Sequence, residues 1–124
     1  MDDGALEAAY AKRRAVLGDD YVDAVTAETD PTAVEFQDYL TATAWGVWAR
    51  DGALSTRDRS LLVLAMTAAL GRMEEFRLHA AASPNAGVTD AEIDELLFQL
   101  VAYCGAPAAV SARREIRALR NERG

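Results

Sequence analysis

The sequence predicts an all-α fold, a single-domain helical bundle of about six helices over residues 1–124. Three observations support this prediction. Alanine, the strongest intrinsic helix former, occurs 26 times. The three prolines and eight glycines stand mostly where helices would begin or end. No segment alternates polar and apolar residues over the length of a strand, so no sheet is expected.

The first part of the chain is predicted to contain three helices. Residues 4–17 carry apolar side chains at helical spacing, and Gly18 follows as a suitable C-terminal cap. A short helix is expected over residues 20–28. Asp30 and Pro31 form an N-cap and a first-turn proline, so a third helix begins there. The apolar face of this third helix is predicted to consist of Phe36, Leu40, Ala44 and Val47.

The middle of the chain contains its most apolar stretch, the run LLVLAMTAAL at residues 61–70. Ser55 and Asp58 form a capping box that starts this helix. A helix that is apolar on all sides must be buried, either in its own core or in a subunit interface. Gly71 is expected to break the helix, and a second helix then runs until Pro84 ends it. The segment 57–82 is therefore predicted to lie at the centre of the fold.

Two further helices are predicted towards the C-terminus. Thr89 and Glu92 form a second capping box, and the helix that follows runs to about Val101. The stretch YCGAP at residues 103–107 is a break, and its proline is suited to start the last helix. Basic residues complement the dipole at the end of that last helix: Arg117, Arg120 and Arg123.

The composition excludes several classes of partner. The net charge of −7 makes nucleic acids and anionic membranes poor partners. A single cysteine cannot form an internal disulfide, so a reducing compartment, and hence a cytoplasmic location, is expected. The acidic start MDDGALEAAY does not have the layout of a signal peptide. The longest apolar run is too short to span a bilayer, which takes about 20 residues.

Residues that could perform chemistry gather around the two central predicted helices. They are Arg57, Arg59, Arg72, Glu75, Arg77 and His79. His79, the single histidine, follows Glu75 by four residues, so the two side chains share a helix face, and the spacing places Arg72 on that face as well. A carboxylate beside an imidazole favours the imidazolium, holds its tautomer and orients the ring.

Each of these residues also has an ordinary structural interpretation. A lone helical histidine is more often structural than catalytic, and arginines often form a solvated face. Cys104 is most simply a small buried hydrophobic residue, and Trp45 and Trp48 are most simply anchors in a core or an interface. One histidine and one cysteine far apart provide no metal-ligand spacing. The composition alone therefore identifies no active site.

A set of motifs resembles a known family. The motifs are RRAVLGDDYVD at 13–23, AWG at 44–46, RSLLVLAM at 59–66, LGRMEE at 70–75, His79, GVTDAEIDELL at 87–97 and YCGAPAA at 103–109. In this order they resemble the carboxymuconolactone decarboxylase family, within the wider alkylhydroperoxidase D-like superfamily. In the peroxidatic branch of that superfamily a CxxC pair precedes the histidine, and here Arg72 and Glu75 stand where those cysteines would be.

The resemblance implies a small all-helical subunit of the alkylhydroperoxidase D-like type, usually assembled as a homohexamer. It implies the decarboxylation, without cofactor or metal, of a small anionic lactone, 4-carboxymuconolactone, to 3-oxoadipate enol-lactone in protocatechuate breakdown. In this interpretation His79 donates a proton to carbon and Glu75 orients it. Arg59 and Arg72 would bind the substrate carboxylates, because guanidinium groups suit that role.

The chain departs from the family pattern at several positions that commonly carry other residues. These positions are Ala42, Thr43, Val47, Arg113 and Arg114. Three alternative functions follow. The protein could act on a related lactone, it could be a peroxiredoxin-like antioxidant protein that uses Cys104 alone, or it could be a non-catalytic helical assembly module. The absence of a second cysteine argues against the antioxidant function.

Overall fold

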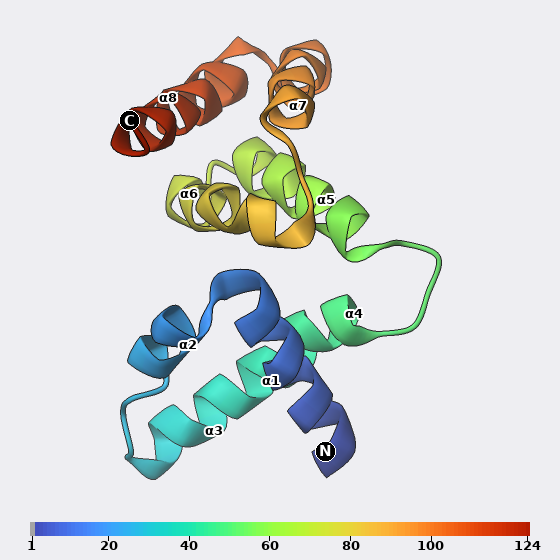
Figure 1. The fold of residues 1–124 in the computed structure, drawn as a ribbon, viewed down its shortest axis with the longest axis vertical. Helices are drawn as coiled ribbons and strands as arrows, with labels where there is room; N and C mark the ends of the chain where they lie inside the picture. The colour runs from blue at the N-terminus through green and yellow to red at the C-terminus, as the bar shows by residue number, and fades with distance from the viewer. Residues whose placement is uncertain (1) are drawn as a thin grey trace. The chain divides into compact units, whose positions relative to one another are not determined.

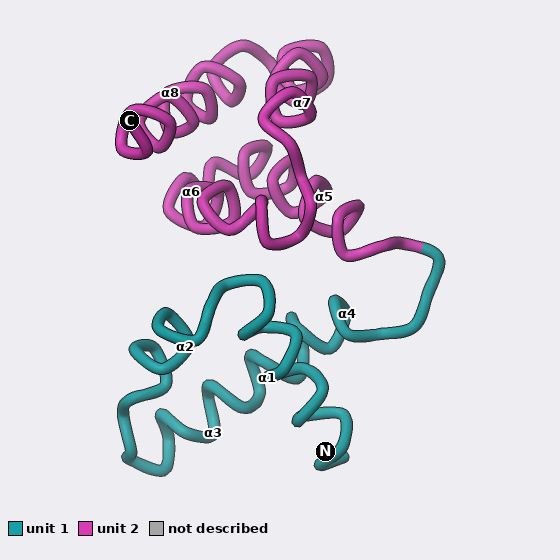
Figure 2. Tube along the Cα trace, in the orientation of Figure 1, with its two compact units in different colours: residues 1–53 teal, residues 54–124 magenta. Residues whose placement is uncertain are grey.

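A computed structural model describes residues 2–124, and this part of the chain is helical with no strand, which confirms the predicted all-α class. The helices, labelled in Figure 1, are α1 (Asp3–Leu17), α2 (Asp19–Val25), α3 (Pro31–Leu40), α4 (Gly46–Ala49), α5 (Thr56–Ala69), α6 (Met73–Ala82), α7 (Asp90–Cys104) and α8 (Ala106–Glu122). A π-helical segment, η1 (Thr41–Trp45), joins α3 to α4, and a 3₁₀ segment, η2 (Ser83–Ala86), follows α6. The chain forms two compact units, residues 1–53 and 54–124, coloured separately in Figure 2.

The helix ends follow the predicted local signals. The side chain of Asp30 accepts a hydrogen bond from the backbone N–H of Ala33, as expected of an N-cap. Both capping boxes form, one starting α5 and the other starting α7. Gly71 has a φ of 73°, a conformation that favours glycine, and it separates α5 from α6 as predicted. These elements are therefore determined largely by local sequence.

In the first unit, α1 packs against η1 and α4. The apolar face predicted for the helix that begins at Pro31 is not the side that packs in this unit. Its four residues, Phe36, Leu40, Ala44 and Val47, are all exposed. The buried side of the segment instead carries Thr41, Trp45 and Trp48. The physical reason is Arg13 of α1, which is buried and needs polar acceptors. Its guanidinium donates to the side-chain oxygens of Gln37 and Thr41, both at 2.9 Å.

Trp45 and Trp48 are the aromatic anchors of the first unit, as predicted. They are 5% and 6% exposed, and their rings stack with centroids 4.9 Å apart.

In the second unit, α5, α6, α7 and α8 enclose one hydrophobic core. Its members are Leu64, Ala68, Phe76, Ala80, Val88, Ile93, Leu100, Ala109, Ala112 and Ile116. The predicted central segment thus supplies two of the helices of this core. Only one side of α5 is buried, however, since Leu62 and Met66 are exposed in the chain, as is Leu70 directly after the helix.

Helix α7 extends to Cys104, a few residues beyond the predicted end at Val101. The prediction that Cys104 is buried was wrong, because the residue is exposed. It occupies the last position of the helix, before Gly105 and one turn beyond Leu100, the last buried residue of α7. Within residues 2–124, no helix has the length and apolar character that a membrane crossing requires.

Candidate functional site

The candidate site lies on the hairpin formed by α5 and α6. Only Leu70, Gly71 and Arg72 separate the two helices, which pack against each other (Figure 1). Such a short connection makes neighbouring helices antiparallel. The first half of α5, which carries Arg59, therefore lies beside the second half of α6, which carries His79. The hairpin thus places these two residues, 20 positions apart in the sequence, on adjacent halves of two neighbouring helices.

His79 is partly buried on α6, one turn after Glu75. Burial lowers the pKa of the imidazole below its ordinary value of 6.5, and the negative charge of Glu75 opposes that shift without reversing it. The expectation that the charge of Glu75 favours the imidazolium is thus confirmed in direction, but burial outweighs it. The free-energy cost of burying a charged imidazole exceeds the stabilisation that the exposed Glu75 carboxylate provides. Neutral imidazole is the favoured form at pH 7.

Arg59 is 8% exposed, and within residues 2–124 its guanidinium makes no ion pair or hydrogen bond. Its nitrogens are not among the buried unpartnered atoms, so the guanidinium itself reaches solvent while the rest of the side chain is covered. The chain carries 20 acidic residues, so a carboxylate partner would have been easy to supply. A buried arginine without an internal anion is suited to bind an external one.

The other two arginines on these helices have structural roles instead. Arg57 forms an ion pair with Glu92 at the start of α7. Arg77 forms ion pairs with Glu115, at 3.2 Å, and with Glu122, both on α8. These contacts tie the hairpin to the last two helices and leave Arg57 and Arg77 less suited than Arg59 to bind a ligand.

Arg72 lies at the turn of the hairpin, where it is exposed. It precedes the first residue of α6 with φ −88° and ψ 71°, which is not helical, so the predicted common face with Glu75 and His79 does not extend to its backbone. The end of α5 beside this turn is ten residues from Arg59, or about 15 Å along the helix. The two predicted carboxylate-binding residues thus stand at opposite ends of the hairpin.

The structure adds Ser60, which sequence reasoning missed. Ser60 follows Arg59 on α5 and is 1% exposed, and its hydroxyl has no hydrogen-bond partner within residues 2–124. The sequence signal was present but faint, since a serine stands four residues before Leu64 in a stripe that is otherwise apolar. A serine in such a place usually bonds to its own helix, and only the structure shows that this one does not.

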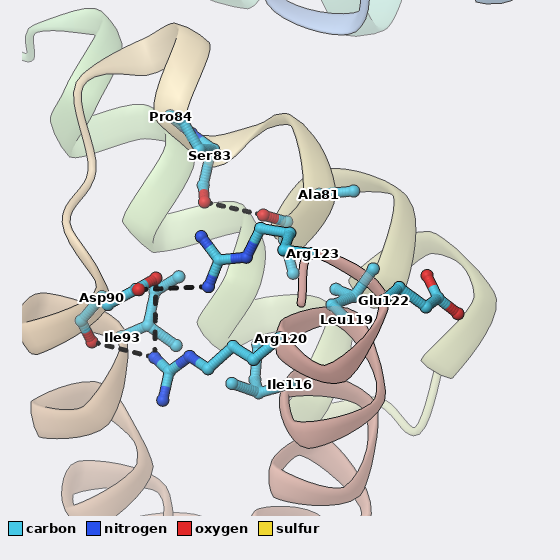
Figure 3. A pocket seen from close by; sticks show the side chains of 11 residues that line it. Ala81, Ser83, Pro84, Asp90, Ile93, Ile116, Leu119, Arg120, Glu122 and Arg123 are labelled. Carbon is cyan, nitrogen blue, oxygen red and sulfur yellow. Dashed lines mark hydrogen bonds and ion pairs between the residues drawn. The ribbon is translucent and has the colours of Figure 1, made fainter.

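A separate cavity of about 190 Å³ lies between α6, α7 and α8 (Figure 3). None of the four predicted site residues lines it. Arg120 and Arg123 enter its lining, but both form ion pairs with Asp90, so their charges are already compensated. Within residues 2–124 no three His, Cys, Asp or Glu side chains gather closely enough to hold a metal ion. The cavity thus offers neither the uncompensated cation nor the imidazole found on the hairpin.

Comparison with known proteins identifies the family of the chain. Residues 35–118 match the carboxymuconolactone decarboxylase family. The chain is 39% identical to 4-carboxymuconolactone decarboxylase of Acinetobacter baylyi over 101 residues, which are 81% of this chain and 75% of that protein. It is 37% identical to nitrosuccinic acid decarboxylase of Metarhizium robertsii, over 81% of this chain and 70% of that protein. The matched family region contains the whole α5–α6 hairpin.

Proposed function

Because this chain belongs to the carboxymuconolactone decarboxylase family, we propose that it is a carboxy-lyase that removes carbon dioxide from a small carboxylated lactone without a cofactor. The observation that supports this most strongly is Arg59, a buried cation with no internal partner in an acidic protein. It lies on the half of α5 that faces the part of α6 with the chain's single histidine. An anion-binding group next to an acid–base group is what decarboxylation requires.

The proposed reaction needs no metal or covalent intermediate. Arg59 binds a substrate carboxylate, with Arg72 as a second candidate at the other end of the hairpin. The bond between the leaving carboxylate and its carbon breaks, and carbon dioxide departs. The electron pair of that bond moves through the conjugated double bond onto the lactone carbonyl oxygen. A proton from His79 then adds to carbon, and the carbonyl forms again.

The lowered pKa of His79 fits this sequence when the charge of the substrate is included. In the free protein the ring is neutral at pH 7, because burial disfavours its charge. A bound anionic substrate supplies negative charge close to the ring, which favours the imidazolium. Substrate binding and proton uptake are thereby coupled, and the acid forms when it is needed. Glu75 acts in the same direction and orients the ring.

The substrate we propose first is 4-carboxymuconolactone, which would place the enzyme in the breakdown of aromatic compounds through protocatechuate. Similarity to the nitrosuccinic acid decarboxylase favours a second candidate, a carboxylic acid with a nitro group beside the leaving carboxylate. A nitro group accepts the electron pair as a carbonyl does, so the same residues would serve both reactions.

We also propose that the enzyme works as a homohexamer in a reducing compartment such as the cytoplasm. The support for assembly is the set of large apolar side chains that the single chain leaves exposed on α5, at its C-terminal end and on α7. They are Leu62, Met66, Leu70, Phe98, Val101 and Tyr103. Exposed apolar surface of this kind commonly becomes a subunit interface.

A substrate screen tests the proposed function. The purified protein is incubated with 4-carboxymuconolactone, with nitrosuccinate and with succinate, and the release of carbon dioxide is followed. Release from the lactone or the nitro acid, lost in His79→Gln, is expected. Succinate is the control, because it offers no group to accept the electron pair. A folded protein that releases carbon dioxide from neither candidate overturns the proposal.

A further inference from the structure

The Ser60 hydroxyl is the most anomalous polar group on the hairpin. It is 1% exposed and has no hydrogen-bond partner within residues 2–124. Several other hydroxyls in shielded positions bond to a carbonyl about one turn earlier in their own helix. These are Thr26 to Val22, Thr41 to Gln37, Thr67 to Val63 and Ser83 to Ala80. Ser60 thus departs from the pattern that these four residues follow.

An unsatisfied buried hydroxyl has a cost in stability, since the group gives up its bonds to water and receives none in return. Alanine would fill the same position on the core side of α5 without that cost. Ser60 stands one turn before Leu64, and Ala68 follows one turn later, so the stripe is otherwise apolar. A donor kept unsatisfied in the free protein is available to a ligand without first breaking another hydrogen bond.

The place of Ser60 connects it to the candidate site. It follows Arg59 in the first half of α5, which packs beside the second half of α6 and η2. That part of α6 carries His79. Three groups therefore come from one region of the hairpin: the unpaired guanidinium of a largely buried arginine, an unsatisfied buried hydroxyl and an imidazole of lowered pKa.

We propose that Ser60 is a catalytic residue that donates a hydrogen bond to the substrate oxygen that gains negative charge as carbon dioxide leaves. This inference rests on the proposed function and deepens it. The carbon–carboxylate bond breaks and its electron pair reaches the carbonyl or nitro oxygen. Ser60 keeps its proton and stabilises that oxygen, while the proton that reaches carbon comes from His79.

The different roles of Arg59 and Ser60 follow from the charge of the substrate group that each one binds. A full carboxylate is present before and after substrate binding, and the Arg59 guanidinium is the stronger partner for it. The acceptor oxygen is nearly neutral in the bound substrate and becomes negative only in the transition state. A preorganised donor in a shielded place acts most strongly on charge that develops there.

Kinetics of Ser60→Ala provide the first test. We expect kcat to fall about 10- to 100-fold with little change in KM, because a hydrogen bond to a charged group is lost only in the transition state. The melting temperature should equal or exceed that of the wild type, because the unsatisfied hydroxyl is gone. An unchanged kcat overturns the inference, whatever the melting temperature.

Ser83→Ala is the matched control. Ser83 is also a buried serine, 2% exposed, but its hydroxyl donates to the carbonyl of Ala80 at 2.7 Å. Removing a satisfied hydroxyl should lower the melting temperature and leave kcat unchanged. If Ser83→Ala and Ser60→Ala alter kcat equally, the effect is one of general packing and the inference fails.

A binding measurement separates this inference from the proposed function. The nitronate form of 3-nitropropionate carries a carboxylate and negatively charged nitro oxygens, which is the charge distribution left after nitrosuccinate loses carbon dioxide. Calorimetric titration should show that the wild type binds the nitronate more tightly than the neutral nitro form, and that Ser60→Ala loses about 10- to 100-fold of this preference. Equal binding of the two forms, or an unchanged preference in the variant, overturns the role of Ser60 even if decarboxylation is found. Inactivity towards every acid overturns the proposed function, and the titration still decides the role of Ser60.

Discussion

At the scale of single residues, the arginines of the second unit differ in whether the fold provides them with a partner. Arg57, Arg77, Arg120 and Arg123 all form ion pairs with carboxylates. Arg59 is buried and makes no such pair within residues 2–124. Because the residue types are identical, the difference lies entirely in their surroundings. The other arginines of this unit without an ion pair in residues 2–124, which are Arg72, Arg113, Arg114 and Arg117, are exposed, so Arg59 is the one whose surroundings strengthen its attraction for an external anion.

His79→Gln is expected to reduce turnover by about 10²- to 10⁴-fold, the usual contribution of a positioned general acid. Glutamine retains polarity and approximate size, so the helical content and the oligomer should be unchanged, as measured by circular dichroism and light scattering. Glu75→Gln should give an intermediate loss, because the ring remains while its charged neighbour is removed. Full activity in His79→Gln would show that the imidazole has a structural role.

Stability should depend on pH through His79. The unfolded chain titrates near 6.5, and burial places the folded pKa lower. Below pH 6.5 the unfolded state binds more protons than the folded state, so the free energy of unfolding falls as pH decreases from about 6.5 through the folded pKa. Urea titrations between pH 7.5 and about 5 should show this decrease in the wild type and a smaller one in His79→Gln. The same pH dependence in both proteins would contradict the lowered pKa.

The two candidate carboxylate-binding residues should differ when replaced. Arg72→Ala is expected to raise KM more than it lowers kcat, if its contact is equal in the ground and transition states. Arg59→Gln should raise KM more than Arg72→Ala does, because a buried guanidinium binds an anion more strongly than an exposed one. Steady-state kinetics on an established substrate measures both. A larger effect of Arg72 than of Arg59 would reverse the assignment.

At the scale of elements, short local motifs determine where the helices begin. In the capping box of α7, Thr89 receives a hydrogen bond from the backbone of Glu92 at 3.2 Å, and the Glu92 carboxylate receives one from the backbone of Thr89 at 2.9 Å. Glu92 also forms an ion pair with Arg57 of α5. The start of α7 is thus connected to the hairpin that carries the candidate site.

Thr89→Ala should lower the free energy of unfolding by about 1 kcal/mol, the typical cost of losing an N-cap side chain. The carboxylate of Glu92 remains, so its ion pair with Arg57 and the kinetic constants should change little. Urea denaturation with a parallel activity assay measures both effects. A loss of activity greater than the loss of folded protein would mean that the start of α7 has a direct part in catalysis.

At the scale of the whole molecule, the chain leaves several large apolar side chains exposed to solvent, outside its own core. Met66 on α5 and Leu70 directly after that helix are 56% and 75% exposed, and Phe98 and Tyr103 on α7 are 72% and 83% exposed. A chain of this size buries only about two-thirds of its unfolded surface by itself. The exposed side chains on both helices offer apolar area for contacts between copies.

Light scattering at micromolar concentration should therefore report a mass of several subunits, and six is the number we propose. Phe98→Glu is expected to weaken the assembly, because a charge would be buried in the interface. The helical content of the variant, measured by circular dichroism, should match the wild type. A monomeric mass for the wild type would contradict the assembly.

The sequence alone determined the features that depend on neighbouring residues. The all-α class, both capping boxes, the break at Gly71 and the tryptophan anchors followed from composition and spacing, because helix ends are set by groups within one or two turns. The family motifs also led to the hairpin that carries His79. These features needed no knowledge of which helices pack together.

Tertiary structure alone decided the features that depend on residues distant in the chain. It placed Gln37 and Thr41 rather than Phe36 against α1, because buried Arg13 requires acceptors. It paired Arg57 with Glu92 and left Arg59 unpaired, and it left the Ser60 hydroxyl unsatisfied. It also buried His79 enough for desolvation to outweigh Glu75 and lower the pKa of the ring. The burial of a side chain and its long-range partners are set only when helices pack. Sequence spacing correctly places Glu75 beside His79, but it does not show how far packing shields the imidazole from water.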